Sequence, residues 1–75
     1  MNIYLYALGQ YFPFSKDRVA MLIEELNAGI NMVRFCSFTK IESFNGNVSI
    51  NLDGRTPVKM TAKELAELLQ KELDK

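Results

Sequence analysis

The residue types that most often carry out catalysis are scarce in this 75-residue sequence. It contains no histidine and a single cysteine, Cys36. The absence of histidine excludes the Ser-His-Asp and Cys-His nucleophilic systems, histidine-ligated zinc and the commonest general base. One cysteine can form neither an internal disulfide nor a cysteine cage for a metal, which is typical of a reducing compartment. We therefore expect no catalytic centre, no cofactor and no metal site.

The remaining candidates for chemistry also lack the required context. Cys36 lies inside an extended segment, with no helix N-terminus beside it in the sequence to lower its pKa, so it is expected to be a small core residue. Asp17, Glu24 and Glu25 do not have the spacing of a metal-binding loop. The four glycines lie singly, so no phosphate-binding loop is present. These patterns predict a protein that is not an enzyme.

Charge and hydropathy set further limits. Nine Lys and Arg residues balance nine Asp and Glu residues, so the net charge attracts neither nucleic acid nor an anionic membrane. No apolar run approaches the roughly 18 residues of a membrane span. The first ten residues have neither the basic region nor the cleavage site of a secretory signal. The expected location is the cytoplasm.

Aromatic residues are the strongest candidates for binding. Five of the eight fall between Tyr4 and Phe14, and tyrosine and phenylalanine are favoured anchors at protein interfaces. A thin core that uses these rings as plugs is the alternative explanation. The residues expected to contact a partner are Tyr4, Tyr6, Tyr11, Phe12, Met32, Arg34, Phe38 and Phe44.

The N-terminal third is expected to form a strand, a connection and a helix. Residues 3–8 alternate with apolar residues on both faces, as in a strand covered on two sides. Residues 9–14 are interpreted as a connection because they contain Gly9 and Pro13. A helix is predicted over residues 16–28. Its features are Ser15 as N-cap, Phe14 and Val19 as a hydrophobic staple, Gly29 after its end, and an apolar stripe of Val19, Leu22, Ile23 and Leu26.

Residues 30–44 are expected to be one long extended segment that enters a hairpin. Asn45-Gly46 favours a two-residue turn, because a type I′ turn needs positive φ at both central positions. This turn places Ile41 opposite Ile50 and Phe44 opposite Asn47. A second turn at residues 53–54 needs an odd number of residues to bring Val58 and Met60 to the side of Val48 and Ile50. Pro57 predicts that the last strand is short and lies at a sheet edge.

The final helix has the clearest local signals. Thr61 and Glu64 have the spacing of a capping box, and Met60 and Leu65 that of a hydrophobic staple. An apolar stripe follows, formed by Ala62, Leu65, Ala66, Leu68, Leu69 and Leu73.

These elements predict a single α+β domain over residues 1–75 with the order β-α-β-β-(β)-α. Two amphipathic helices would cover one face of a three- to four-stranded, mainly antiparallel sheet, giving a two-layer sandwich. The position of the first strand in the sheet is left open. The uncovered face would present the even positions of the long extended segment, namely Met32, Arg34, Cys36, Phe38, Lys40, Glu42 and Phe44, with Tyr4 and Tyr6 if the first strand joins them. Loops folded over this face are the alternative.

An aromatic sheet face without a third layer indicates a protein–protein interaction module, acting as a homodimer or by docking on another protein. Such a small, neutral domain would suit a phage or mobile-element accessory protein that acts by binding or occlusion. One alternative is a single-stranded nucleic-acid-binding protein, with bases stacked on the rings and Arg34, Lys40, Arg55 and Lys59 near the phosphates. Another is a scaffold subunit of an enzyme.

Overall fold

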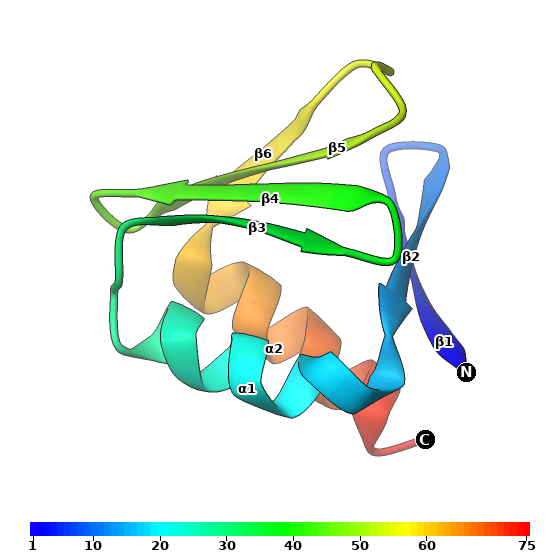
Figure 1. Ribbon diagram of the computed structural model, residues 1–75, viewed down its shortest axis with the longest axis horizontal. Helices are drawn as coiled ribbons and strands as arrows, with labels where there is room; N and C mark the ends of the chain where they lie inside the picture. Colours follow the sequence, from blue (N-terminus) through cyan, green and yellow to red (C-terminus); the bar gives the residue numbers. More distant parts are fainter.

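The computed structural model describes all 75 residues, which form two antiparallel sheets and two helices (Figure 1). The order of the elements is β-β-α-β-β-β-β-α. Their bounds are β1 Asn2–Ala7, β2 Gln10–Ser15, α1 Lys16–Asn27, β3 Met32–Cys36, β4 Thr39–Phe44, β5 Asn47–Leu52, β6 Val58–Thr61 and α2 Ala62–Leu73.

The main sheet is an antiparallel meander with the strand order β3-β4-β5-β6. Both helices lie on one of its faces and leave the other uncovered (Figure 1). The expected α+β sandwich is confirmed, with four strands in the main sheet. Neither helix is long and apolar enough to cross a membrane.

The predicted pairing around the central hairpin is confirmed. Asn45 and Gly46 both have positive φ, Ile41 pairs with Ile50 and Phe44 pairs with Asn47. On the other side of β5, Val48 pairs with Met60 and Ile50 with Val58, as the odd-length turn requires. The last strand is short and lies at an edge, which fits the missing donor of the preceding Pro57.

Both helices begin where the sequence predicts. In α2, the Glu64 amide donates to Thr61 Oγ1 at 3.1 Å and the Thr61 amide donates to Glu64 Oε1 at 3.3 Å, which completes the capping box. Ser15 is the N-cap of α1 by position, but its side chain makes no capping hydrogen bond. The predicted apolar stripe of α1 is buried in full.

The interpretation of residues 9–14 as a connection is wrong. Residues 10–15 form β2, which pairs with β1 through a turn at Leu8 and Gly9, both with positive φ. Leucine rarely adopts this conformation, so the turn carries no usual sequence signal. The first strand consequently belongs to a separate two-stranded sheet, and no crossover links it to the main sheet.

The interpretation of residues 30–44 as one extended segment is also wrong. A two-residue turn at Ser37 and Phe38, with φ of 51° and 73°, divides them into β3 and β4. Because a two-residue turn pairs Cys36 with Thr39, the even positions of β3 share a face with the odd positions of β4. Met32 and Cys36 therefore face the helices.

The core is one cluster of 17 buried residues, to which both sheets and both helices contribute. The β1–β2 hairpin closes the end of the sandwich at the β3–β4 turn, where Thr39 Oγ1 donates to the Pro13 carbonyl at 2.7 Å. A second hydrogen bond joins the hairpin to the loop before β6, where Gln10 Nε2 donates to the Thr56 carbonyl at 3.3 Å. Phe12 and Phe14 are fully buried beneath the hairpin.

Candidate functional site

The largest concentration of exposed aromatic residues lies on the outward side of the β1–β2 hairpin. We call this surface, formed by Tyr4, Tyr6, Leu8 and Tyr11, the tyrosine face. The three tyrosines are between 54% and 63% exposed, and Leu8 is exposed at the tip of the hairpin. Tyr6 and Tyr11 are opposite each other in the ladder, with ring centroids 4.7 Å apart and ring planes at 56°.

Strand alternation explains why these rings point outward. Leu5 and Phe12 are also cross-strand partners, but they lie on the opposite side of the hairpin and are buried. Successive side chains of a strand point to opposite faces, so burying Leu5 and Phe12 directs Tyr4, Tyr6 and Tyr11 to solvent. The tyrosine face is the outer side of an element whose inner side anchors it to the core.

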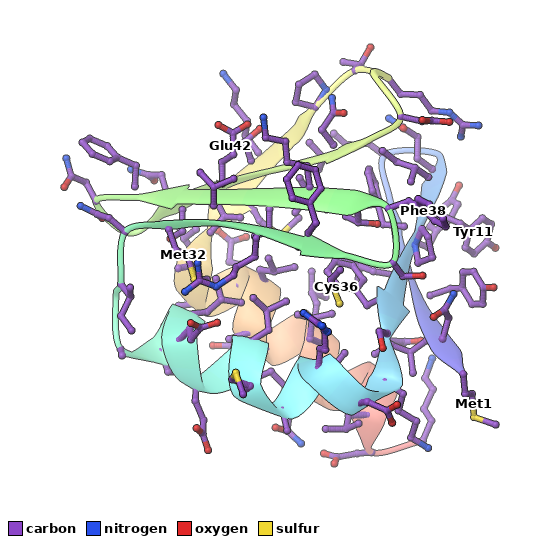
Figure 2. All side chains as sticks on the ribbon, viewed as in Figure 1. Met1, Tyr11, Met32, Cys36, Phe38 and Glu42 are labelled. Atoms are coloured by element: carbon purple, nitrogen blue, oxygen red, sulfur yellow. The ribbon has the colours of Figure 1, made fainter.

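Phe38 extends this aromatic surface toward the main sheet. It is the most exposed aromatic residue, at 84%, and lies in the β3–β4 turn. The adjacent Thr39 is hydrogen-bonded to Pro13 of β2, which holds the turn beside the hairpin. Figure 2 shows Phe38 and Tyr11 at the same end of the molecule. Two segments that are distant in sequence therefore present rings at one end.

The uncovered face of the main sheet is more mixed. Val33, Phe35 and Phe44 are exposed there, but charged and polar residues separate them. Lys40 Nζ lies 3.7 Å from Glu42 Oε1 and 6.0 Å from the centroid of the Phe35 ring. A wide, open depression of about 760 Å³ is lined mostly by polar residues, among them Glu42 and Lys59.

The structure separates the eight residues expected to contact a partner into two groups. Tyr4, Tyr6, Tyr11, Phe38 and Phe44 are exposed, and Arg34 is partly exposed at the edge of the sheet beside α1. Two expectations are wrong: Phe12 and Met32 are only 0% and 7% exposed. Phe12 is on the inner side of an unpredicted strand, and the β3–β4 turn rotates Met32 to the helix side.

Cys36 is buried where β2 meets β3, which confirms the expectation of a small core residue, whereas its placement on the uncovered face is wrong. The Ser15 amide donates to its sulfur at 3.2 Å. Burial raises the pKa of the Cys36 thiol, and the Ser15 amide and the charge of Arg18 oppose this rise. The thiol is therefore neutral at physiological pH and poorly suited to nucleophilic chemistry. No group of three His, Cys, Asp or Glu side chains is arranged to hold a metal ion.

Among the exposed apolar residues that sequence reasoning missed, Leu8, Val33 and Phe35 lie in the two sheets or their turns. The missed signal is that the buried positions change between even and odd residue numbers from one strand to the next. Buried positions are even in β3 and odd in β4, which requires an even-length turn between the strands. In the first hairpin the buried position is likewise odd in β1, at Leu5, and even in β2, at Phe12.

No family model, curated protein or solved structure matches this chain.

Proposed function

We propose that this protein is a non-catalytic interaction module that binds another protein through its tyrosine face. One observation carries the proposal: six of the eight aromatic side chains are more than half exposed. Aromatic residues are normally the most valuable contributors to a core, and a domain of this size has few to spare. Three of these six, Tyr4, Tyr6 and Tyr11, lie on one side of one hairpin.

The chemistry of the tyrosine face fits a protein partner. None of its four residues is charged, and charged residues are depleted at the centre of protein interfaces. Tyrosine offers a large apolar ring and a hydroxyl while losing little side-chain entropy on binding. Antiparallel pairing and the buried Phe12 and Phe14 hold the strands that carry the tyrosines in place, which lowers the ordering cost of association.

The mode of action that suits such a module is occlusion, in which the domain covers a surface that its partner needs. The one thiol of the domain is buried, so it is not presented at the surface for nucleophilic chemistry. A reducing cytoplasm suits a chain whose lone thiol is unpaired.

Single-stranded nucleic acid is the less favoured ligand. Two of the four cations expected near phosphates are paired with carboxylates, Arg34 with Glu25 at 2.8 Å and Lys40 with Glu42 at 3.7 Å. The tyrosine face itself carries no cation. Backbone phosphates supply most of the affinity of such binding, so an uncharged face offers it little.

Site-specific photo-crosslinking in the cell tests this proposal. A photoreactive phenylalanine analogue replaces Tyr11, and in a control it replaces Lys63, which is exposed on α2. We expect a protease-sensitive adduct of defined mass from position 11 and none from position 63. An adduct removed by nuclease would instead support nucleic-acid binding. Equal labelling at the two positions, or no adduct at position 11, would contradict the proposal.

A further inference from the structure

The β4–β5 turn contains Asn45-Gly46, which is chemically labile as well as suited to a tight turn. Asparagine is thermolabile because the backbone nitrogen of the next residue can attack its side-chain amide. A side chain on that next residue hinders the attack, whereas glycine has none, and the space where a Cβ of Gly46 would lie is open. The other five asparagines are followed by residues with side chains, namely Ile3, Ala28, Met32, Val48 and Leu52. Asn45 is therefore the most susceptible asparagine of the chain.

Both reacting groups of this turn are free. Asn45 and Gly46 are exposed, and neither the Asn45 carboxamide nor the Gly46 N–H forms a hydrogen bond within the chain. The Asp53-Gly54 turn differs, because the Gly54 amide donates to Asn51 Oδ1 at 3.1 Å. Of these two turns, only the first leaves the nitrogen of its glycine unengaged.

The reaction at Asn45 needs only water as a co-reactant. The Gly46 nitrogen loses its proton to solvent and bonds to Cγ of Asn45, the bond from Cγ to the side-chain nitrogen breaks, and ammonia leaves. Water then opens the resulting five-membered succinimide ring at one of its two carbonyls. One opening gives aspartate, and the other gives an isoaspartyl link in which the main chain runs through the former side chain. Nothing is oxidised or reduced.

Two hydrogen bonds hold the turn away from the reactive geometry. With φ of 51° and 80°, Asn45 and Gly46 form a type I′ turn. Closing the ring requires the Gly46 nitrogen to rotate from its place in this turn into line with Cβ of Asn45. The Asn45 amide donates to Asn31 Oδ1 and the Ala62 amide donates to the Gly46 carbonyl, both at 2.9 Å. These contacts must open before the ring can close.

We infer that Asn45 is a site of spontaneous deamidation whose rate is set by the hydrogen bonds from the turn to Asn31 and Ala62. Asn31 lies in the connection between α1 and β3, and Ala62 is the first residue of α2. The observed rate is the rate in the open turn multiplied by the fraction of chains in which the turn is open. Contacts with two distant segments thus determine how long a chain stays unmodified.

Conversion of Asn45 should destabilise the fold. Either product replaces a neutral amide with a carboxylate in a depression that Glu42 and Glu64 also line, so like charges approach one another. The isoaspartyl product also adds one atom to the chain between β4 and β5, which a two-residue turn does not accommodate. The hydrogen bond between the Gly46 carbonyl and the start of α2 is then displaced. Aged chains should be less stable than new ones.

This inference goes beyond the proposed function because it concerns a different part of the molecule. The β4–β5 turn lies at the end of the main sheet that is away from the β1–β2 hairpin (Figure 1). The tyrosine face and the crosslinking test at position 11 do not involve this turn. The two proposals can therefore fail separately.

Peptide mass spectrometry of the purified chain, incubated in its folded state at mildly alkaline pH, tests the site. Each conversion replaces NH2 with OH and raises the mass of the fragment that contains it. We expect Asn45 to convert before any other asparagine, and to convert faster in urea than in the folded chain. Asn45→Gly is the control, because glycine accepts the positive φ of the turn but has no amide to lose.

Removing one of the two hydrogen bonds tests the role of the fold. Asn31→Ala deletes the acceptor of the Asn45 amide, so conversion should be about 2- to 10-fold faster in the folded chain and unchanged in urea. Asn51→Ala is the matched control. It removes the same kind of acceptor from the next turn and should leave the rate at Asn45 unchanged.

Four results would overturn the inference. They are earlier conversion of another asparagine in the folded chain, no conversion of the folded chain after several weeks, equal rates for wild type in the folded state and in urea, and a folded Asn31→Ala variant that converts at the wild-type rate. The first three are measured on the wild-type chain, so the test stays decisive even if the Asn31→Ala variant folds poorly.

Discussion

The outward sides of the two sheets follow the same alternation but differ in composition. On the main sheet, Val33, Phe35 and Phe44 are interspersed with Lys40, Glu42 and Lys59. On the β1–β2 hairpin, the tyrosine face contains no charged residue. A mixed face is the ordinary solvent side of an antiparallel sheet. The tyrosine face has instead the composition of an interface centre.

Under the proposed function, this difference separates the contribution of the hairpin to stability from its contribution to binding. A two-stranded hairpin is marginally stable alone. Phe12 and Phe14 compensate for this by inserting its inner side into the core. The outer side is then available for a partner, because its side chains contribute little to folding. Substitutions on the two sides should therefore have separable effects.

The largest expected effect comes from the inner side. Phe12→Ala should lower the free energy of unfolding by about 3–5 kcal/mol, because it removes a fully buried ring and leaves a cavity. Urea denaturation measures the change. Tyr11→Ala, at the neighbouring outward position, is the control and should change it far less. Similar losses for both variants would show that the two sides do not differ as argued.

A smaller loss is expected at the junction of the two sheets. Thr39→Val retains the shape of the side chain but leaves the partly buried Pro13 carbonyl without its donor, which should cost about 1–2 kcal/mol. Ser43→Ala is the matched control in the same strand, because the buried Ser43 hydroxyl has no hydrogen-bond partner in the chain. It should be neutral or slightly stabilising. Thermal melts distinguish the two, and equal destabilisation would refute the role of the Thr39–Pro13 bond.

The same junction controls the reactivity of Cys36. At pH 8 a disulfide reagent should label the folded protein at least about tenfold more slowly than the chain in urea, because the thiol is buried and its pKa is raised. Below the ordinary pKa of 9.0 the thiol is neutral in both states. Above it the unfolded chain loses its proton first, so stability should fall as pH rises. Rapid labelling of the native protein would show that the hairpin opens readily from the sheet.

The smallest change in stability is expected on the tyrosine face. Tyr6→Ser combined with Tyr11→Ser should lower the free energy of unfolding by only about 1 kcal/mol, since it removes an exposed aromatic pair. The same change should abolish partner binding. Phe44→Ser, on the mixed face, is the control that should retain binding. Loss of binding in both variants would move the interface away from the hairpin.

Much of the fold is predictable because its signals are local. The capping box at Thr61, the Asn45-Gly46 turn and the parity of the β5–β6 loop each depend on a few neighbouring residues. The two missed turns contain Leu8-Gly9 and Ser37-Phe38, where residues other than glycine and asparagine adopt positive φ. The pairing of the flanking strands, each with a buried inner side, requires these two-residue turns, so the preferences of the turn residues do not reveal them.

The candidate site shows the same division. The tyrosines are conspicuous in the sequence, and their position predicts exposure once β1 and β2 are known to pair. Phe12 and Met32 were assigned to the wrong side because their faces depend on the two missed turns. A change in the parity of buried positions is the signal that would have placed both.

The packing of α2 against β1 has a consequence for how the chain folds. The meander from β3 to β6 pairs only neighbouring strands, so its contacts form between residues close in sequence. By contrast, β1 and α2 lie at opposite ends of the sequence. Strands at both ends of the structure, β1 of the hairpin and β5 and β6 of the meander, pack against α2, so the inner sides of both sheets are covered in full only when this helix docks. The inward-facing Phe12 and Phe14 are thus among the apolar side chains whose burial depends on the most distant contacts in the chain.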